Sequence, residues 1–373
     1  MKKSWKFSVN LHHKTMDKYY IRGMEQLGIG VTDVHAAWKW YRENFGADIK
    51  ILDDDSEAKY MLRYTGGVPH RRHAILAVSL QGGGGFEIWQ YKSHESTKPL
   101  FDIQLGDLGI FAGKIKTDNL EKALAFFKAK TDGTKTSEMV TDPKGDKYFW
   151  LQDPFGNYFQ VVYDASKYKD EGKITGLSVG AVIGVPDIEK AKDLYKDILG
   201  YDIEVYNTES AVCDDFSFVP GGNNSFKRLL LRHSEERIGG FGKIFGASEI
   251  ELVEVTDREP KKMFEGRFWG DRGFIHLCFD VQGVDVLRNV CKEKGYPFTV
   301  DTLEVLNGQD FDMGDSSGMF AYIEDMGGTL IEFTEAYKIP LTKWFALKLK
   351  GRDPQKPLPN LLLKALRFKK YKE

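Results

Sequence analysis

One alternation of hydrophobic and polar positions recurs four times along the chain. Each copy begins with a short apolar strand that ends near an aspartate, and continues with an amphipathic helix that a glycine often closes. Several strands follow, and the last one tends to place a glutamate between apolar residues. Self-similarity at this scale indicates a repeated structural unit. The pattern therefore predicts four βαβββ modules.

The first strands of the four copies lie near residues 27–33, 110–118, 182–187 and 274–280. Copies one and three resemble each other most, as do copies two and four, so a unit of two modules is inferred to have been duplicated. The joint lies near residues 164–173, a charged stretch that is typical of a linker. The division is then a first domain at 24–165 and a second at 174–337, between an N-terminal extension at 1–23 and a tail at 338–373.

Aspartates mark the predicted starts of three helices. Asp33, Asp118 and Asp187 each precede an apolar helical pattern, and a short carboxylate there accepts the free N–H groups of the first turn. The fourth copy has no clean aspartate at this position. We therefore expect three aspartate-capped helices and a less defined start for the fourth.

Composition and charge limit the classes of function. The chain has 373 residues, of which 42% are apolar and 29% charged, and its net charge is -2. This is a soluble, globular composition with room for more than one core. Residues 1–23 carry six Lys/Arg against one Asp, and residues 338–373 carry eleven against two acids, so the body between them is acidic. Such a body argues against general nucleic-acid binding.

The chain also lacks the signals of secretion and membrane insertion. Cys213, Cys278 and Cys291 form no C-x-x-C pair, which favours a reducing compartment. The N-terminal segment has no apolar stretch of signal-peptide length, and no run of 18 apolar residues occurs. We expect a cytoplasmic protein.

The basic tail has two interpretations. Its last part predicts a helix with an apolar stripe flanked by lysines and arginines; the stripe consists of Leu361, Leu362, Ala365 and Phe368. The favoured interpretation is a tail that docks against the acidic modules. The alternative is an interfacial helix that rests on anionic lipid, which would make the protein membrane-associated.

The fourfold βαβββ pattern resembles the vicinal oxygen chelate superfamily, which includes glyoxalase I, methylmalonyl-CoA epimerase, extradiol dioxygenases and bleomycin-resistance proteins. The resemblance covers roughly residues 24–336. It implies an α+β fold in which two tandem glyoxalase-like domains form two curved mixed-sheet cups, with a C-terminal helical tail in addition. It also implies that the first and last strands of each module supply metal ligands.

The resemblance assigns a ligand position to each of these strands. The four first-strand positions hold Gln26, Phe111, Gly180 and His276, and the four last-strand positions hold Glu87, Gln160, Glu251 and Glu332. Phenylalanine and glycine have no ligating side chain, so two complete sites are excluded. One site remains for one divalent ion, Zn, Ni, Co, Fe or Mn, because imidazole, carboxylate and amide oxygen suit these ions. The first domain is then degenerate in metal binding.

The ligand set depends on which modules share a cup. If module three pairs with module four, the ligands are Glu251, His276 and Glu332. If module one pairs with module four, they are Gln26, Glu87, His276 and Glu332, which resembles the glyoxalase I pattern. Sequential units usually pack together, so the three–four pairing is modestly favoured.

The resemblance implies a metal-dependent isomerase, epimerase or lyase. Such an enzyme chelates adjacent oxygens of a small substrate and moves a proton α to a carbonyl through an enolate or enediolate, with Glu251 or Glu332 as the base. An iron-dependent extradiol-type dioxygenase is a weaker alternative, because its ligand set needs two histidines. A non-catalytic small-molecule-binding cup is the third alternative. The partner is a small molecule rather than a nucleic acid, and both monomer and homodimer remain open.

Overall fold

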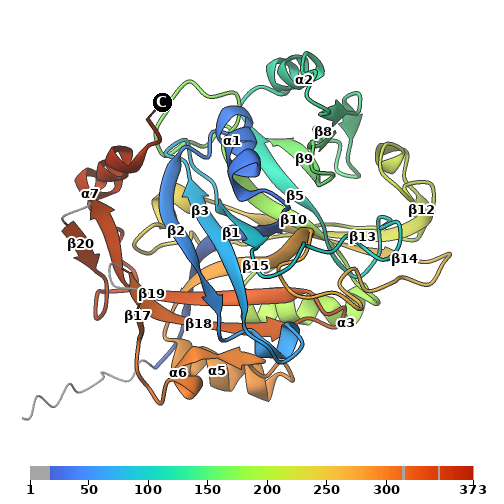
Figure 1. The fold of residues 1–373 in the computed structure, drawn as a ribbon. Coiled ribbons are helices and arrows are strands. Elements are labelled where there is room, and N and C mark those ends of the chain that lie inside the picture. Colours follow the sequence, from blue (N-terminus) through green and yellow to red (C-terminus); the bar gives the residue numbers. More distant parts are fainter. Residues whose placement is uncertain (1–16, 313–315, 343–344, 373) are drawn as a thin grey trace, which may run out of the picture.

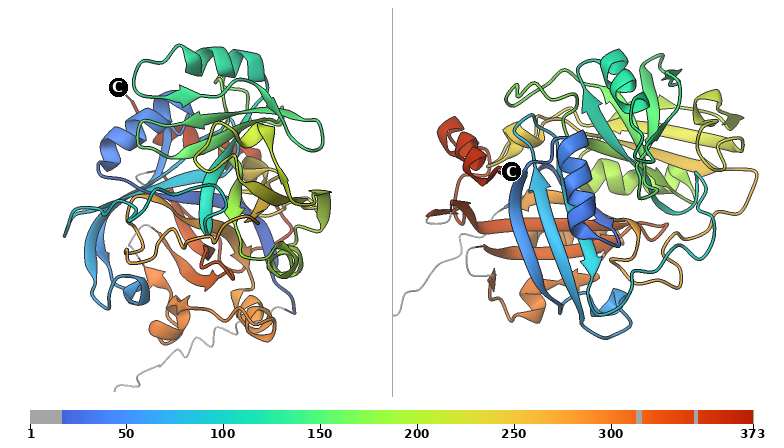
Figure 2. Two further views of the ribbon diagram at one scale, coloured as in Figure 1. Left: turned by 90° about the vertical axis from the view of Figure 1, so that its right-hand side faces the viewer. Right: turned by 45° about the horizontal axis from the view of Figure 1, so that its top comes forward.

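The predicted α+β fold is confirmed by the computed structural model, which describes residues 17–312, 316–342 and 345–372. Four βαβββ modules build two curled mixed sheets (Figures 1 and 2). Residues 1–16, most of the predicted basic N-terminal extension, lie outside the described part of the chain.

The first two modules contain two α-helices between them. The elements of module one are β1 (Tyr20–Gly30), α1 (Val34–Asn44), β2 (Ile49–Ala58), a 3-10 turn (Leu62–Tyr64), β3 (His70–Val78) and β4 (Gly85–Tyr91). Those of module two are β5 (Gly109–Thr117), α2 (Leu120–Lys128), β6 (Lys135–Thr136), β7 (Val140–Thr141), β8 (Lys147–Gln152) and β9 (Tyr158–Tyr163).

The last two modules repeat this order with additional short helices. Module three has β10 (Ser178–Gly184), α3 (Ile188–Asp193), a π-helical turn (Leu194–Ile198), β11 (Ile203–Asn207), β12 (Ala211–Val212), a 3-10 turn (Asp214–Phe216), β13 (Ser225–Arg232), α4 (Gly242–Phe245) and β14 (Glu249–Val255). Module four has β15 (Gly273–Gln282), α5 (Val284–Glu293), β16 (Val300–Asp301), α6 (Thr302–Val305), β17 (Phe311–Asp312), β18 (Ser317–Glu324) and β19 (Leu330–Thr342).

The strand pairing corrects one prediction. The first strand of module one, β1, lies antiparallel to β15 of module four, and the sheet runs β16-β18-β19-β15-β1-β4-β3-β2. The other sheet runs β11-β13-β14-β10-β5-β9-β8-β6 and joins modules two and three through β5 and β10. We call these sheets the one–four cup and the two–three cup. The favoured three–four pairing was therefore wrong, and the first and last modules lie side by side (Figure 1).

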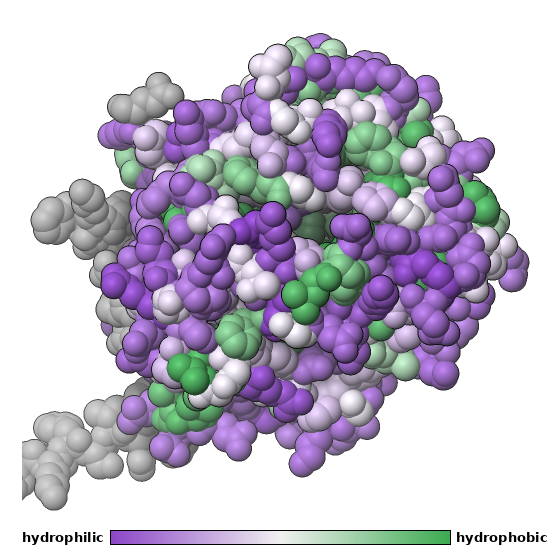
Figure 3. Space-filling view, turned by 45° about the vertical axis from the view of Figure 1, so that its right-hand side comes forward, coloured by the Kyte–Doolittle hydropathy of each residue, from purple (hydrophilic) through white to green (hydrophobic). Residues whose placement is uncertain are grey.

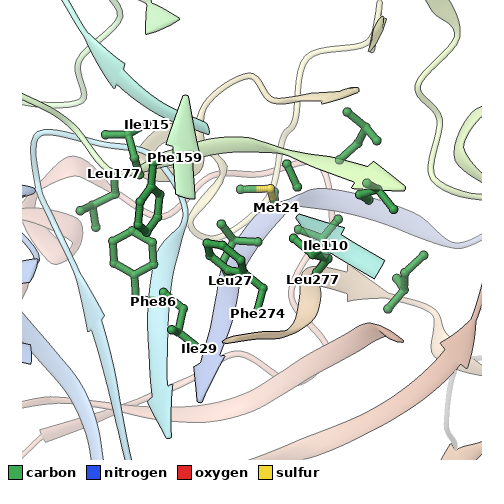
Figure 4. Close-up of a cluster of buried hydrophobic side chains, with 14 of the residues drawn as sticks. Met24, Leu27, Ile29, Phe86, Ile110, Ile115, Phe159, Leu177, Phe274 and Leu277 are labelled. Carbon is green, nitrogen blue, oxygen red and sulfur yellow. The ribbon is translucent and has the colours of Figure 1, made fainter. Parts of the chain in front are cut away.

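One hydrophobic cluster lies between the two sheets. It draws on all four modules, and its labelled members in Figure 4 are Met24, Leu27, Ile29, Phe86, Ile110, Ile115, Phe159, Leu177, Phe274 and Leu277. The ring of Phe159 from β9 lies 5.4 Å from the ring of Phe274 from β15. Full burial of a side chain of this size contributes about 1.5–3 kcal/mol. The cluster therefore holds the backs of the two sheets together, which leaves their other faces free for chemistry.

Two of the three predicted aspartate caps are confirmed. The Asp33 carboxylate accepts two backbone N–H groups of α1, and the Asp187 carboxylate accepts one from α3. The third prediction was wrong by one residue, because Asn119 rather than Asp118 caps α2. Helix α5 begins after Gly283, which has no side chain to cap it, in agreement with the missing aspartate in the fourth copy. The Glu335 carboxylate of β19 accepts the N–H groups of Gly283 and Val284 instead.

The tail docks against the body, as the favoured interpretation predicts. Strand β20 (Phe345–Lys348) pairs with β19, and α7 (Asn360–Ala365) continues into a 3-10 turn (Leu366–Lys369). Leu363 and Leu366 are buried in a cluster with Ile49 of β2 and Ile244 of α4. The Lys370 ammonium lies 2.8 Å from the Glu171 carboxylate of the linker.

The predicted apolar stripe is not the buried face of the tail. Leu361 is 81% exposed and Phe368 is 63% exposed. Lipid contact by this stripe stays a prediction. None of the described helices is both long and apolar enough to cross a bilayer. The face of the molecule drawn in Figure 3 is mainly hydrophilic, and its apolar patches are small and scattered.

Candidate metal centre

The one–four cup brings together three predicted ligands from three neighbouring strands. His276 lies on β15, Glu87 on β4 and Glu332 on β19. The His276 Nε2 atom is 3.1 Å from Glu332 Oε2 and 3.3 Å from Glu87 Oε2. One ligand atom from each residue lies within 4.8 Å of the other two. Among the described residues, this is the one cluster of three His, Cys, Asp or Glu side chains at such distances.

Strand alternation explains why these side chains meet. Successive residues of a strand point to opposite faces of the sheet. Phe86 and Ile88 enter the core between the sheets, as do Ile331 and Phe333. Glu87 and Glu332 therefore point to the concave face, where they flank His276. The pattern of alternating apolar and acidic residues in the sequence encodes this placement directly.

The cluster has the properties of a cation site. His276 is fully buried, and neither of its ring nitrogens has a hydrogen-bond partner among the described residues. The same holds for the buried Glu332 Oε2 atom. An unsatisfied buried polar atom costs about 1–3 kcal/mol. A divalent ion would satisfy these lone pairs, and imidazole with two carboxylates is a suitable donor set.

The electrostatics of the cluster point the same way. Burial raises the pKa of Glu87 to about 7, although His276 opposes the shift. Burial lowers the pKa of His276, but Glu332 and Glu87 outweigh it and the net pKa is raised. Two buried carboxylates thus repel each other and compete for one proton of the imidazole. A bound cation would relieve this repulsion.

Gln26 lies at the symmetric position of the same cup. On β1 it stands two residues before Gly28, which pairs with Glu87; on β15, His276 stands two residues before Cys278, which pairs with Glu332. Gln26 is 5% exposed. The strand register thus gives it the place in module one that His276 has in module four.

Glu25 is a half-buried acid of this cup that sequence reasoning missed. The pairing of β1 with β15 shifts register between Met24 and Gln26, which leaves Glu25 in a bulge. Its carboxylate accepts a hydrogen bond from the Thr334 hydroxyl, and burial raises its pKa to about 8. A bulge interrupts the two-residue alternation. No feature of the sequence marks where the alternation breaks.

An aromatic wall covers the cluster. The indole of Trp269, from the segment between β14 and β15, stacks over the His276 ring at 5.9 Å between ring centroids. Tyr322 of β18 contacts the same ring edge-on at 5.8 Å. Trp269 lies outside the regular strands, so no periodicity in the sequence assigns it to the site. These rings keep water away from His276.

Gly28 makes the room that the His276 ring occupies. The two residues face each other across β1 and β15. A methyl group on Gly28 would lie 2.4 Å from His276 Cε1 and 2.6 Å from Nδ1, distances that real contacts do not reach. Glycine at this position is therefore a requirement of the site rather than of a turn.

We expect Gly28→Ala to displace the imidazole and weaken metal binding. Loss of alignment at a ligand costs roughly 10–100-fold in metal affinity. The measurement is a competition titration with a chromogenic chelator. Gly67→Ala is the matched control, since a methyl group there meets no atom within 4 Å, although its φ of +79° adds local strain. Equal metal affinities of wild type and Gly28→Ala would show that the ring does not need this space.

The two–three cup holds Glu251, which overturns the ligand set predicted for a pairing of modules three and four. Glu251 lies on β14 in the other sheet and cannot join His276. Its carboxylate instead accepts hydrogen bonds from Arg228 at 3.0 and 2.8 Å, and from the Tyr206 hydroxyl at 2.9 Å. The Lys114 ammonium lies 3.1 Å away. Burial opposes the shift, but Lys114 and Arg228 lower the pKa of Glu251 to about 2. The carboxylate is therefore ionised, and its oxygens are already paired with these cations, so we do not assign it the role of a base.

The first-strand ligand positions of this cup carry no ligating side chain. Gly180 has no ligating side chain, as predicted. The register pairs Lys114 with Gln160, which places Ala112 rather than Phe111 in the position that corresponds to His276. The side chains of Ala112 and Phe111 have no atom that can bind a metal ion. The prediction placed the site in the second domain, at 174–337, and made the first domain degenerate; the three clustered side chains instead come from both domains, from modules one and four.

Comparison with known families and structures agrees with the fold. Residues 23–161 and residues 181–311 each match a family model of the glyoxalase/bleomycin resistance protein/dioxygenase superfamily, and together the matches span well over half of the chain. A comparison with curated proteins gives no significant match.

Solved structures share the arrangement at low sequence identity. Glyoxalase I from Zea mays is 13% identical, with 85% of this chain and 92% of that chain covered and a TM-score of 0.50. A point mutant of the same maize enzyme gives 14% identity, the same coverage and a TM-score of 0.52. A putative dioxygenase from Bacillus subtilis is 13% identical, with 85% and 86% of the two chains covered and a TM-score of 0.50. At such identities the likeness concerns the fold alone.

Proposed function

The chain belongs to the glyoxalase/bleomycin resistance protein/dioxygenase superfamily, and we propose that its one–four cup is the active site of a divalent-metal-dependent isomerase, epimerase or lyase. One observation carries the proposal. His276, Glu87 and Glu332 direct their ligand atoms toward one another in a buried cup, and the imidazole has no other partner among the described residues.

Four residues would hold the ion: His276, Glu87 and Glu332 from the cluster, and Gln26 from the symmetric position. When bound, a divalent ion supplies a Lewis acid that polarises adjacent oxygens of a substrate. Trp269 and Tyr322 exclude water from the imidazole side of the cup, which strengthens electrostatic interactions within it. The substrate is then a small molecule with two neighbouring oxygens.

Glu332 is the residue we assign to proton transfer. Its Oε2 atom is buried 3.1 Å from His276 Nε2, so the carboxylate lies beside the proposed ion, where a chelated substrate would present its proton. In this role the carboxylate removes a proton α to a carbonyl and returns it at the neighbouring carbon. Glu251, the other predicted base, is excluded because it lies in the other cup.

The dioxygenase alternative is less favoured by this donor set. An extradiol-type iron site uses two histidines and one carboxylate. In the one–four cup the first-strand position of module one is Gln26, so His276 is the single histidine among the proposed ligands. We retain the cytoplasm as the proposed location, since the structure leaves all three cysteines unpaired, as a reducing compartment would.

Metal content tests the proposal directly. Protein purified without chelator should carry about one equivalent of a transition metal per chain, because the described residues form one cluster of three potential ligands. His276→Ala should retain less than roughly a tenth of an equivalent, since a buried ligand is removed. Elemental analysis by mass spectrometry measures both. A metal-free wild-type protein that also takes up no added Zn, Ni, Co, Fe or Mn would refute the metal centre.

A further inference from the structure

The two–three cup contains a large cavity that the proposed function leaves unused. Its volume is ≈ 710 Å³, within the usual range for small-molecule sites. Its lining includes Lys114, Gln160, Tyr206, Arg228 and Glu251. Val162, Val179 and Leu120 supply apolar surface. The cavity thus combines a charged group of side chains with apolar walls.

An ammonium group occupies the centre of this cup. Lys114 on β5 pairs with Gln160 on β9, as Gly28 pairs with Glu87 in the other cup. Gly180 stands opposite Lys114 across the central strands, as His276 stands opposite Gly28. The Lys114 Nζ atom lies 2.8 Å from Glu249 and 3.1 Å from Glu251. A built-in cation therefore lies between acidic residues, in the cup that lacks metal ligands.

The hydrogen-bond donors of Lys114, Arg228 and Gln160 are nearly all paired with groups of the cup. Arg228 donates to Asp215 and Glu251 through all of its guanidinium nitrogens. Lys114 has three N–H donors and spends two on the glutamates. The Gln160 amide donates to Glu251 at 3.3 Å, while its oxygen accepts no hydrogen bond from the described residues. One ammonium N–H and one amide oxygen therefore remain for a ligand.

We propose that the two–three cup is a second, metal-free binding site, in which the Lys114 ammonium binds the oxygen of a neutral carboxamide or similar carbonyl compound. Gln160 accepts an N–H of the same ligand, and the apolar walls hold its hydrocarbon part. The site binds and does not catalyse, since the Lys114 ammonium is held by two carboxylates and the ionised Glu251 carboxylate is already paired with cations.

Charge balance selects the neutral ligand. Among the groups joined by ion pairs in the cup, Lys114, Arg228 and Arg232 are matched by three carboxylates, those of Asp215, Glu249 and Glu251. The lining further includes Asp142, Asp146, Asp164 and Lys147. A carboxylate ligand would add an unmatched negative charge beside two buried glutamates. A metal ion or an amine would add positive charge beside Lys114. Either addition is costly in a buried site.

Benzamide, benzoate and benzylammonium form a matched set of probes for this proposal. They share one ring and differ in charge, so ligand-observed NMR titrations of the full chain compare the charge states directly. Benzamide should bind saturably, and the two charged probes should bind at least roughly tenfold more weakly. EDTA should leave benzamide binding unchanged, which separates this site from the metal centre. Failure of the metal centre would leave these results intact.

Two variants locate the binding. Lys114→Met should weaken benzamide binding by roughly tenfold or more, because a charge-assisted hydrogen bond is lost. Ala247→Trp should have a similar effect by filling the cavity, since Ala247 is an exposed residue of its lining. Ala211→Trp, at an exposed position outside the lining, is the control and should bind as wild type does. The absence of saturable benzamide binding, or its persistence in Ala247→Trp, would overturn the proposal.

Discussion

Glu332→Gln should slow proton exchange at the substrate by roughly 10²–10⁴-fold, the usual contribution of a general base. The carboxamide keeps an oxygen in place of the ligand atom but cannot take up a proton. The substitution should therefore spare most of the bound metal while it removes turnover. The readout is exchange of the proton α to the carbonyl in D2O, followed by NMR over a panel of 2-oxo and 2-hydroxy carbonyl compounds.

Glu87→Gln is the matched control for this prediction. Glu87 Oε2 lies 3.3 Å from the same imidazole nitrogen, so both variants remove one carboxylate from the cluster. If Glu332 is the base, Glu332→Gln loses far more exchange activity than Glu87→Gln at equal metal content. The reverse order would assign proton transfer to Glu87. Equal exchange rates in wild type and Glu332→Gln would show that Glu332 acts only as a ligand.

The sequence predicts the modules and most ligand positions because both are local properties. Alternation along a strand places Glu87 and Glu332 on one face whatever the partner strand is. The same holds for His276 on its own strand. These positions are also the ones that the structure brings together, which explains why a repeat pattern alone located the cluster.

The pairing of the modules is not a local property. The free edges of β1, β5, β10 and β15 have similar backbone hydrogen-bond donors and acceptors, so any two of these strands could pair by backbone hydrogen bonds. The difference lies in side chains across the pair. Lys114 and Glu249 on β5 and β14 form a buried ion pair only if modules two and three share a sheet. Two lysines interrupt the apolar stretch 109–117, and Lys114 was the available signal, but its meaning depended on its partner Glu249.

The sequence alone also could not predict the inserted bulge residue or the close side-chain contacts of the site. The bulge at Glu25 and the contact of Trp269 with His276 both depend on how one module meets another. Gly28 is different, because the glycine was visible in the first strand, but its role follows only from the ring that lies opposite. Each of these features arises at the junction of modules one and four, where the pairing decides the neighbours.

Glu251→Gln should destabilise the fold by about 3 kcal/mol at pH 7 without changing the metal content. The reason is the pKa of Glu251, which Lys114 and Arg228 hold at about 2 against burial, compared with 4.5 for an ordinary glutamate. A difference of this size corresponds to about 3 kcal/mol when the carboxylate is charged in both states. The neutral amide leaves Lys114 and Arg228 without that partner. Urea unfolding followed by circular dichroism measures the loss.

The pH dependence of this loss distinguishes the ion pair from a packing defect. A carboxylate whose pKa is lowered by folding stabilises the protein above its unfolded pKa, and that contribution disappears as the pH falls through the folded pKa. The stability difference between wild type and Glu251→Gln should thus be constant above about pH 4.5 and shrink toward pH 2. A difference that stays constant down to pH 2 would indicate lost packing rather than lost charge. A loss of bound metal in this variant would instead return Glu251 to the metal centre, against the separation of the two cups.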